Sequence, residues 1–393
     1  MTRLVVAPDS FKGTITAARA AAAIRDGWLS VRPADEVVLR RLADGGEGTL
    51  DAFAAAVPGS RRMPVDVTAP WEGGPVAASW LRLPATPGAP SGIGVVELAS
   101  TAGIELFGDR RDPWRASTAG FGDAIAAALD AGVSRLVLAI GSSASTDGGA
   151  GLLRALGARF RADASVVEAP RLGAGHLPLL RGVELSGLRA LPPGGALVLP
   201  DVSAPLCGPT GAARVFGPQK GVAADRLAEL DAILARYATL FDVDPATPGA
   251  GAAGGTGFAL LVWGASLEPG ALEVARLIGL EDAAANADVV VTGEGSFDGQ
   301  SAAGKAPAHV SAVAAALGVP AALVAARLDL VAAEGLRAIR LAHRARAPRR
   351  SPRPGRGRPG RSRPVAARGG RGARPRPLLT RRDAGTTHGR HRC

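Results

Sequence analysis

Acidic side chains recur directly after the predicted strands, in short segments that also contain glycine. Three such segments read Ala-Asp-Gly-Gly-Glu-Gly, Ser-Thr-Asp-Gly-Gly and Thr-Gly-Glu-Gly. Ligands of open α/β sheets bind at the carboxyl ends of the strands, so these carboxylates are expected to share one edge. Each of them, taken alone, is more simply explained as a helix cap or turn former. The set comprises Asp9, Asp44, Glu47, Asp147, Asp201, Glu294 and Asp298.

Lysine is rare in this chain, and its positions are informative. The 46 basic residues include only three lysines, Lys12, Lys220 and Lys305. Each is next to a glycine, in Phe-Lys-Gly, Gln-Lys-Gly and Gly-Lys-Ala. A compact ammonium beside a glycine can approach a phosphate closely. Three incidental surface lysines are the alternative interpretation.

Carboxylates and lysines in strand-end loops together favour a Mg²⁺-phosphate site. Phosphoryl transfer needs cations near the moving charge, carboxylates that hold Mg²⁺ and a base near the attacking hydroxyl. Histidine contributes little, since only His176 of the five histidines precedes residue 309. The sequence therefore offers no plausible histidine for Ser-His-Asp hydrolysis.

Two glycine-rich segments resemble nucleotide-binding motifs by letter alone. Residues 249–254 match the dinucleotide fingerprint, but no strand precedes them and no acidic ribose partner is evident. Residues 299–306 match a P-loop except that Ala306 replaces the Mg²⁺-binding Ser or Thr. We reject both motifs but keep a phosphate role for Gly304-Lys305, where a loop enters a helix.

The order of the predicted elements indicates an interrupted α/β fold. Two β-loop-α units open the chain, and strands with parallel-sheet character return near its end. Short strands between Pro and Gly turns lie in the middle and are typical of a mixed sheet. The expected strands are 3–7, 36–42, 63–68, 76–83, 94–98, 135–140, 196–200, 288–292 and 320–325. The expected helices are 16–29, capped by Thr16, then 49–56, 122–131, 224–240 and helices beginning near 151 and 307.

The composition fits a cytoplasmic α/β enzyme. The 393 residues are 47% hydrophobic but only 4% aromatic, so the core is expected to consist of Ala, Val, Leu and Gly. Two cysteines exclude a disulfide scaffold and a cysteine-based zinc site. No apolar run is long enough for a transmembrane helix, and the N-terminus has no cleavage-site pattern.

The positive charge of the chain belongs to its C-terminal segment. Residues 344–393 contain 17 arginines and one aspartate, whereas the preceding 343 residues contain 29 basic and 34 acidic side chains. The body thus has no basic patch for nucleic acid. The Arg/Pro/Gly-rich segment is predicted to be disordered. Three interpretations stay open: an arm attracted to RNA or membranes, a solvated extension without a role, and GC-rich sequence translated in the wrong frame.

Six motifs, in order, resemble those of the bacterial glycerate kinase family. The resemblance extends from about Arg3 to Asp329. Two departures are mild, Ser142 where the family usually has a second glycine and Ser145 where it usually has threonine. The motifs are residues 7–13 (Ala-Pro-Asp-Ser-Phe-Lys-Gly), 43–49 (Ala-Asp-Gly-Gly-Glu-Gly-Thr), 143–151 (Ser-Ala-Ser-Thr-Asp-Gly-Gly-Ala-Gly), 216–221 (Phe-Gly-Pro-Gln-Lys-Gly), 251–255 (Gly-Ala-Ala-Gly-Gly) and 292–295 (Thr-Gly-Glu-Gly).

The resemblance implies ATP-dependent, Mg²⁺-requiring phosphorylation of D-glycerate, at the 2-hydroxyl. It implies a flavodoxin-like doubly wound parallel sheet, residues 1–57 and 285–342, interrupted by an inserted α/β domain with a mixed sheet, residues 58–284. The family continues beyond strand 320–325 with a further strand and helix. Residues 343–393 stand there instead, so this strand and helix are expected to be missing. A kinase of another small hydroxy acid, or an inactive kinase-like protein whose basic tail binds nucleic acid, are the alternatives.

We place the site between the two expected domains and divide its residues by role. The expected partners are ATP and a small-molecule acid, without a membrane. Lys12 and Lys305 would neutralise phosphates, and Lys220 would bind phosphate or the glycerate carboxylate. Asp201 or Asp298 would accept the hydroxyl proton. The nucleotide would also contact Ser10, Gly293, Gly295 and Gly304, and the candidates for Mg²⁺ are Asp44, Glu47 and Glu294.

Overall fold

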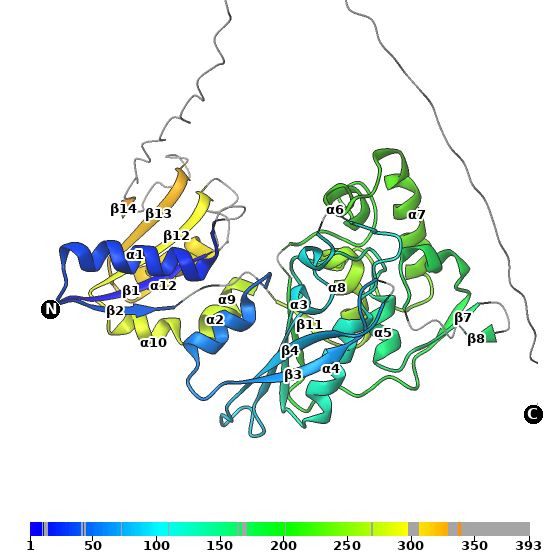
Figure 1. Ribbon diagram of the computed structural model, residues 1–393, viewed down its shortest axis with the longest axis horizontal. Coiled ribbons are helices and arrows are strands. Elements are labelled where there is room, and N and C mark those ends of the chain that lie inside the picture. The colour runs from blue at the N-terminus through cyan, green and yellow to red at the C-terminus, as the bar shows by residue number, and fades with distance from the viewer. Residues whose placement is uncertain are drawn as a thin grey trace, which may run out of the picture. The chain divides into compact units, whose positions relative to one another are not determined.

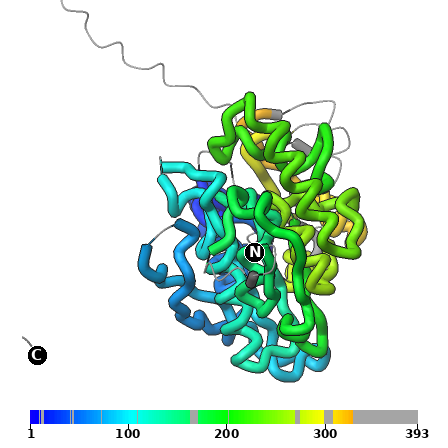
Figure 2. Tube along the Cα trace, turned by 90° about the vertical axis from the view of Figure 1, so that its right-hand side faces the viewer, coloured from blue at the N-terminus to red at the C-terminus, as the bar shows by residue number. Residues whose placement is uncertain are grey.

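The computed structural model describes residues 1–9, 11, 15–40, 42, 45–71, 73–108, 110–162, 165–166, 171–200, 202–268, 270–297, 306–328 and 337–338. Figure 1 labels their helices and strands, and Figure 2 follows the chain through them by colour. Residues 1–343 form one compact unit, and residues 344–393, assigned to a second unit, lie outside the described part. Among the described helices, none combines the length and the apolarity that crossing a membrane would require.

The first and last strands of the fold share one parallel sheet. β1 pairs with β2 on one side and with β12 on the other, although β1 and β12 are far apart in sequence. This strand order is that of a flavodoxin-like doubly wound sheet. The five strands, in spatial order, are β14 (Arg337–Ala338), β13 (Ala321–Leu328), β12 (Val289–Phe297), β1 (Arg3–Pro8) and β2 (Glu36–Leu39).

Both faces of this sheet are covered, which explains the continuous apolar runs of its strands. Leu4 and Val6 pack toward helix α1 (Ala17–Val31). Val5 and Ala7 point to the opposite face, where α10 (Leu280–Ala285) and α12 (Ala306–Ala316) contribute apolar side chains. Figure 1 shows α1 and α12 beside the strands of this sheet. As predicted, the Thr16 side chain caps α1 by accepting a hydrogen bond from the Arg19 N–H.

The middle of the chain forms a mixed six-stranded sheet. β3, β4 and β5 are antiparallel neighbours, whereas β5, β6, β10 and β11 run parallel. A separate three-stranded sheet contains β8 (Ser165–Val166), β7 (Arg159–Ala162) and β9 (Gly182–Glu184). The six strands, in spatial order, are β11 (Ser266–Leu267), β10 (Ala196–Leu199), β6 (Arg135–Ala139), β5 (Ile93–Glu97), β4 (Val76–Leu83) and β3 (Arg61–Val67).

Two apolar clusters cover the six-stranded sheet. On one face, Val96, Leu138 and Val198 join side chains from the helices in the middle of the chain. On the other face, Val137 and Leu199 join a cluster that also contains Val5 and Val290 of the five-stranded sheet. The remaining helices are α2 (Thr49–Ala56), α3 (Ala99–Ala102), α4 (Ala119–Asp130), α5 (Ala150–Ala155), α6 (Ala212–Lys220), α7 (Leu227–Ala238), α8 (Ala252–Val262) and α9 (Gly270–Leu277), with short 3₁₀ helices η1 (Ile104–Phe107), η2 (Ala174–Leu179) and η3 (Ala224–Arg226).

These sheets confirm the predicted fold class, an α/β fold with one parallel and one mixed sheet, and correct three details. β2 ends at Leu39, earlier than predicted. β12 continues to Phe297, five residues beyond the predicted end, because its pairing with β13 extends to Phe297–Leu328. The strand beyond β13, expected to be missing, is present as the two-residue β14. The proposed boundaries of two domains stay a prediction.

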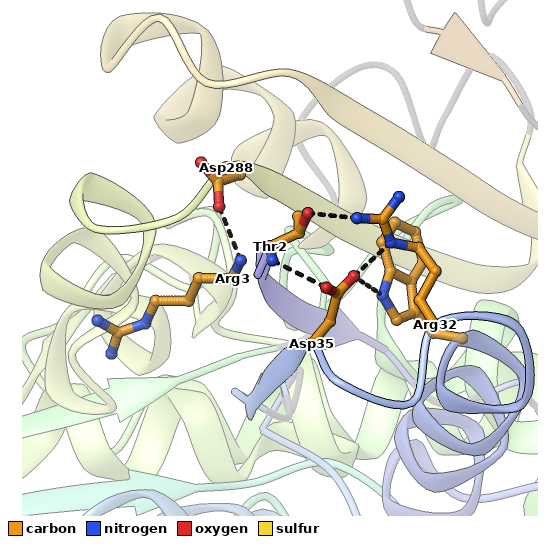
Figure 3. Close-up of polar contacts among 6 residues, drawn as sticks. Thr2, Arg3, Arg32, Asp35 and Asp288 are labelled. Atoms are coloured by element: carbon orange, nitrogen blue, oxygen red, sulfur yellow. Dashed lines mark hydrogen bonds and ion pairs between the residues drawn. The ribbon is translucent and has the colours of Figure 1, made fainter.

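A polar cluster links the beginnings of β1 and β2 to the carboxyl end of α1 (Figure 3). The Asp35 carboxylate accepts hydrogen bonds from the Thr2 N–H at 2.8 Å, from the Trp28 indole N–H at 3.1 Å and from the Arg32 guanidinium. Arg32 also donates to the Thr2 hydroxyl at 2.7 Å. The bonds from Arg32 and Thr2 lower the pKa of Asp35 to about 2.

This lowered pKa predicts how acid affects stability. A carboxylate whose pKa is lower in the folded than in the unfolded state stabilises the fold fully above the unfolded value, near 4, and this stabilisation is lost as pH falls through about 2. We expect the Asp35→Asn variant to lose stability at pH 6 and to show a smaller decline between pH 4 and 2. Urea unfolding at pH 6, 4 and 2 measures both effects. Asp26→Asn, on an exposed carboxylate of α1 that pairs with Arg25, is the control, and equal declines in Asp35→Asn and wild type would contradict the prediction.

Candidate functional site

The pairing of β1 with β12 brings two buried carboxylates together. Pro8 pairs with Gly293, and the next residue, Asp9, donates its N–H to the Gly293 carbonyl at 2.8 Å. Asp9 and Glu294 therefore follow one another in register on adjacent parallel strands, with exposures of only 5% and 6%. Side chains at such paired positions lie on the same face of a sheet. The predicted ligand edge thus carries acidic groups from both ends of the fold.

Gly293, Glu294 and Gly295 were expected in a loop, and the structure places them inside β12 instead. The glycine at position 293 is required because a Cβ there would clash with the Val324 carbonyl of the neighbouring strand β13. Thr292, fully buried, donates its hydroxyl to the Ala7 carbonyl at 2.9 Å and adds a second link between β1 and β12. This segment is therefore held as a strand rather than as a free phosphate loop.

The segment Gly45–Gly48 lies directly on the edge of the six-stranded sheet. The Gly141 N–H, just beyond β6, donates to the Gly45 carbonyl at 2.8 Å. A Cβ on Gly45, whose φ is +87°, would lie 2.5 Å from the Leu199 carbonyl oxygen at the end of β10. Only glycine permits this approach. The carboxylate between these glycines, Glu47, is exposed.

Asp147 is a structural carboxylate at this edge. It is completely buried, and burial raises its pKa. Its oxygens accept hydrogen bonds from the Thr118 N–H and hydroxyl, at 2.8 and 2.7 Å, and from the N–H groups of Gly149 and Gly151. These donors lie at the beginnings of α4 and α5, where backbone N–H groups need acceptors. Asp147 thus joins two helices and has the capping role that we weighed for each carboxylate.

Lys220 contacts the β6–α5 loop and is only 3% exposed. Its ammonium, at the end of α6, donates to the Ser143 hydroxyl at 2.6 Å and to the Ser145 carbonyl at 2.7 Å. A buried ammonium needs such partners. The glycine-containing segment 251–255, at the beginning of α8, reaches the same loop, since a Cβ on Gly254 would clash with the Ser145 carbonyl. The glycine-rich segment therefore supports protein backbone, in agreement with our rejection of a dinucleotide fingerprint.

Several predicted site residues lie outside the described part of the chain. Of the predicted residues that the structure describes, Gly293, Glu294 and Gly295 lie in β12 of the five-stranded sheet. Glu47 lies in the segment that contacts the six-stranded sheet, and Lys220 ends α6 and bonds the β6–α5 loop. The predicted residues not described are Ser10, Lys12, Asp44, Asp201, Asp298, Gly304 and Lys305.

Sequence reasoning missed one buried carboxylate at this edge, Glu97. It is the last residue of β5 and is 5% exposed, and burial raises its pKa. Its oxygens accept the N–H groups of Leu50 at 2.9 Å and of Gly48 at 3.4 Å. The signal was a charged residue inside the apolar run Gly-Val-Val-Glu-Leu, a position where a lone acid needs a partner.

Asp9 and Glu294 of the five-stranded sheet fit Mg²⁺ only together with a ligand's oxygens. Within the described residues, no three His, Cys, Asp or Glu side chains gather into a metal-binding group. Mg²⁺ at phosphate sites commonly uses one or two carboxylates and completes its shell with phosphate and water. Asp9 and Glu294 offer hard oxygen donors of that number on adjacent strands.

The fold is that of the open α/β proteins, a class in which ligands bind at the carboxyl ends of the parallel strands. The sequence profile described as "Glycerate kinase family" matches residues 4–346. The chain therefore belongs to the glycerate kinase family and is a kinase. This confirms the resemblance that the six motifs indicated.

Similar proteins carry the same family name. The "Glycerate kinase" of Bacillus subtilis strain 168 is 39% identical over 326 residues, which cover 81% of this chain and 83% of that protein. The "Glycerate 2-kinase" of Escherichia coli K12 is 40% identical over 324 residues, 79% of this chain and 82% of that protein. A crystal structure of a proposed glycerate kinase 2 from Salmonella typhimurium LT2 superimposes with a TM-score of 0.72 at 38% identity, covering 86% and 90% of the two chains.

The backbone conformation of Ser142 leads to a prediction about stability. Ser142 has a φ of +58° and is exposed, so a left-handed conformation is imposed on a non-glycine residue. That conformation costs about 1–2 kcal/mol, while the added freedom of glycine in the unfolded chain offsets about 0.5–1 kcal/mol. We expect Ser142→Gly to raise the free energy of unfolding by about 0.5–1 kcal/mol.

Urea unfolding of Ser142→Gly measures this change. Ser142→Ala is the matched control, because it removes the hydroxyl but keeps the Cβ, and it should give no gain. A gain of the same size in Ser142→Ala would show that the hydroxyl, rather than the backbone conformation, is responsible.

Proposed function

We propose that this chain transfers the γ-phosphoryl group of ATP to the 2-hydroxyl of D-glycerate, with Mg²⁺. Membership of the glycerate kinase family over residues 4–346 carries the proposal. The relative named "Glycerate 2-kinase", 40% identical, supports the choice of the 2-hydroxyl. The buried carboxylates Asp9 and Glu294 on adjacent strands, and the exposed Glu47 in a glycine-rich segment, support a metal and phosphate site. The cytoplasm stays the predicted location.

The roles of individual residues form part of this proposal. Lys12 and Lys305 neutralise the charge of the phosphates. Lys220 adds positive charge below the loop that contains Ser143 and Ser145, and can attract a phosphate or the glycerate carboxylate. Asp201 or Asp298 accepts the proton of the attacking hydroxyl. Ser10, Gly293, Gly295 and Gly304 contact the nucleotide.

Carboxylates supply anionic oxygen ligands that Mg²⁺ requires. Glu294, with its neighbour Asp9, would hold Mg²⁺ from the five-stranded sheet, and Glu47 would hold it from the segment on the six-stranded sheet. Asp44, outside the described residues, is the further candidate ligand. When bound, Mg²⁺ neutralises phosphate charge and orients the oxygens of the transferring group. The protein's part is then to align the hydroxyl with the phosphorus and to remove its proton.

The three lysines test the proposed charge neutralisation. We expect Lys12→Ala and Lys305→Ala each to lower kcat by about 10²–10³, the usual cost of losing one preorganised charge stabiliser. Lys220→Ala should lower kcat similarly and should also reduce thermal stability, since it leaves the buried Ser145 carbonyl without this donor. The measurement is the rate of ADP release that depends on added D-glycerate.

Arg25→Ala is the control variant, because it removes a cation that pairs with Asp26 on α1 and is expected to leave kcat unchanged. A kcat near that of the wild type in all three lysine variants would contradict the charge argument. An absence of D-glycerate-dependent ADP release in the wild-type chain would contradict the proposed substrate itself.

The position of phosphorylation is tested by the product. Phosphorus attached to the 2-oxygen couples to one proton, and phosphorus on the 3-oxygen couples to two. We therefore expect the proton-coupled ³¹P NMR signal of the product to be a doublet. A triplet would assign the transfer to the 3-hydroxyl, and authentic 2- and 3-phosphoglycerate provide the references.

A further inference from the structure

The segment that joins the two sheets is held at one point of the six-stranded sheet. After β2, the chain crosses through Gly45–Gly48 and enters α2. The hydrogen bond between Gly141 and Gly45 fixes the beginning of this crossing, and a Cβ on Gly141 would lie 2.6 Å from the Cα of Gly46. The backbones of the two segments are thus in direct contact, without side chains between them.

Glu97 fixes the other end of the crossing. The residue at the N-cap of α2, Gly48, has no side chain that could accept a hydrogen bond from the first turn. The Glu97 carboxylate supplies this acceptor from β5, by accepting the N–H groups of Gly48 and Leu50. A negative charge at a helix N-terminus is also favourable for the helix dipole. Both carboxylate oxygens are engaged in this way, so Glu97 acts on the segment and not on a substrate.

Glu47 lies between these two attachments. Its neighbours on either side, Gly46 and Gly48, are the residues that contact Gly141 and Glu97. Flexible glycines would otherwise let this segment move. The position of the Glu47 backbone relative to the six-stranded sheet therefore depends on the Glu97 carboxylate.

We propose that Glu97 is a positioning residue that holds the 45–48 segment, and with it the Glu47 carboxylate, at the metal-phosphate edge. The inference rests on the proposed function, because it gives Glu47 a role toward Mg²⁺. The charged groups that face Glu97 are Asp51 of α2 and Arg62 of β3, which pair with each other at the surface. The Glu97 carboxylate is buried behind them, and its hydrogen bonds run to the backbone of the crossing segment.

The Glu97→Gln variant tests this role, with Asp51→Asn as the matched control. Both exchange a carboxylate for an amide near the start of α2, but the exposed Asp51 does not bond the segment. In Glu97→Gln, the Gly48 and Leu50 amides should exchange hydrogen at least about tenfold faster, while those of β6 keep the wild-type rate. The Mg²⁺ concentration for half-maximal rate should rise about tenfold, as is usual when the support of a metal ligand is lost. The KM for D-glycerate should stay within about twofold.

Several outcomes would overturn this inference, and they differ from those that would refute the proposed function. Unchanged exchange at Gly48 and Leu50, or an unchanged Mg²⁺ requirement, would overturn it. Faster exchange throughout the chain would also overturn it, because that indicates a loss of global stability. If Glu97→Gln does not fold, Glu97→Asp provides the same test, since its shorter side chain keeps the charge but cannot reach both N–H groups. A wild-type chain without glycerate kinase activity would refute the proposed function, and the exchange rates would still decide whether Glu97 holds the segment.

Discussion

The parallel pairing of β1 with β12 is the interaction on which the arrangement of the candidate site depends. It joins residues 4–8 to residues 289–293 and is strengthened by the hydroxyl of Thr292, which reaches the Ala7 carbonyl. Parallel strands end at the same edge, so this pairing places Asp9 beside Glu294 although 284 intervening residues separate them in the chain. A shift of one residue in register would turn one of the two carboxylates to the other face of the sheet.

Burial then divides the polar residues of the motifs into two groups. Asp147 looks like a catalytic group in the sequence, but its hydrogen bonds go to the beginnings of α4 and α5. A buried charge without partners would be costly, and Asp147 has the partners that it needs. Glu47 is exposed and free of that constraint. The motifs therefore combine groups that hold the edge in shape with groups that can meet a ligand.

Much of the secondary structure could be predicted because its signals are local. α2 and β4 have the predicted bounds, Thr16 caps α1 as expected, and the change from parallel to mixed texture matches the two sheets. The end of β12 was predicted too early because glycine usually marks a turn. Pairing with β13 overrides that tendency, and Gly293 is needed there for the close approach of Val324.

The sequence by itself determined the class of fold, the order of the motifs and the family, since these depend on residue types and on spacing along the chain. It also predicted the strand ends as the place for chemistry. Only the tertiary structure decided that Glu97 caps α2, that Asp147 joins α4 and α5, and that Gly45 packs against the backbone of Leu199. The physical reason is that burial and hydrogen-bond partners come from segments far apart in sequence, and no local pattern records which segments will meet.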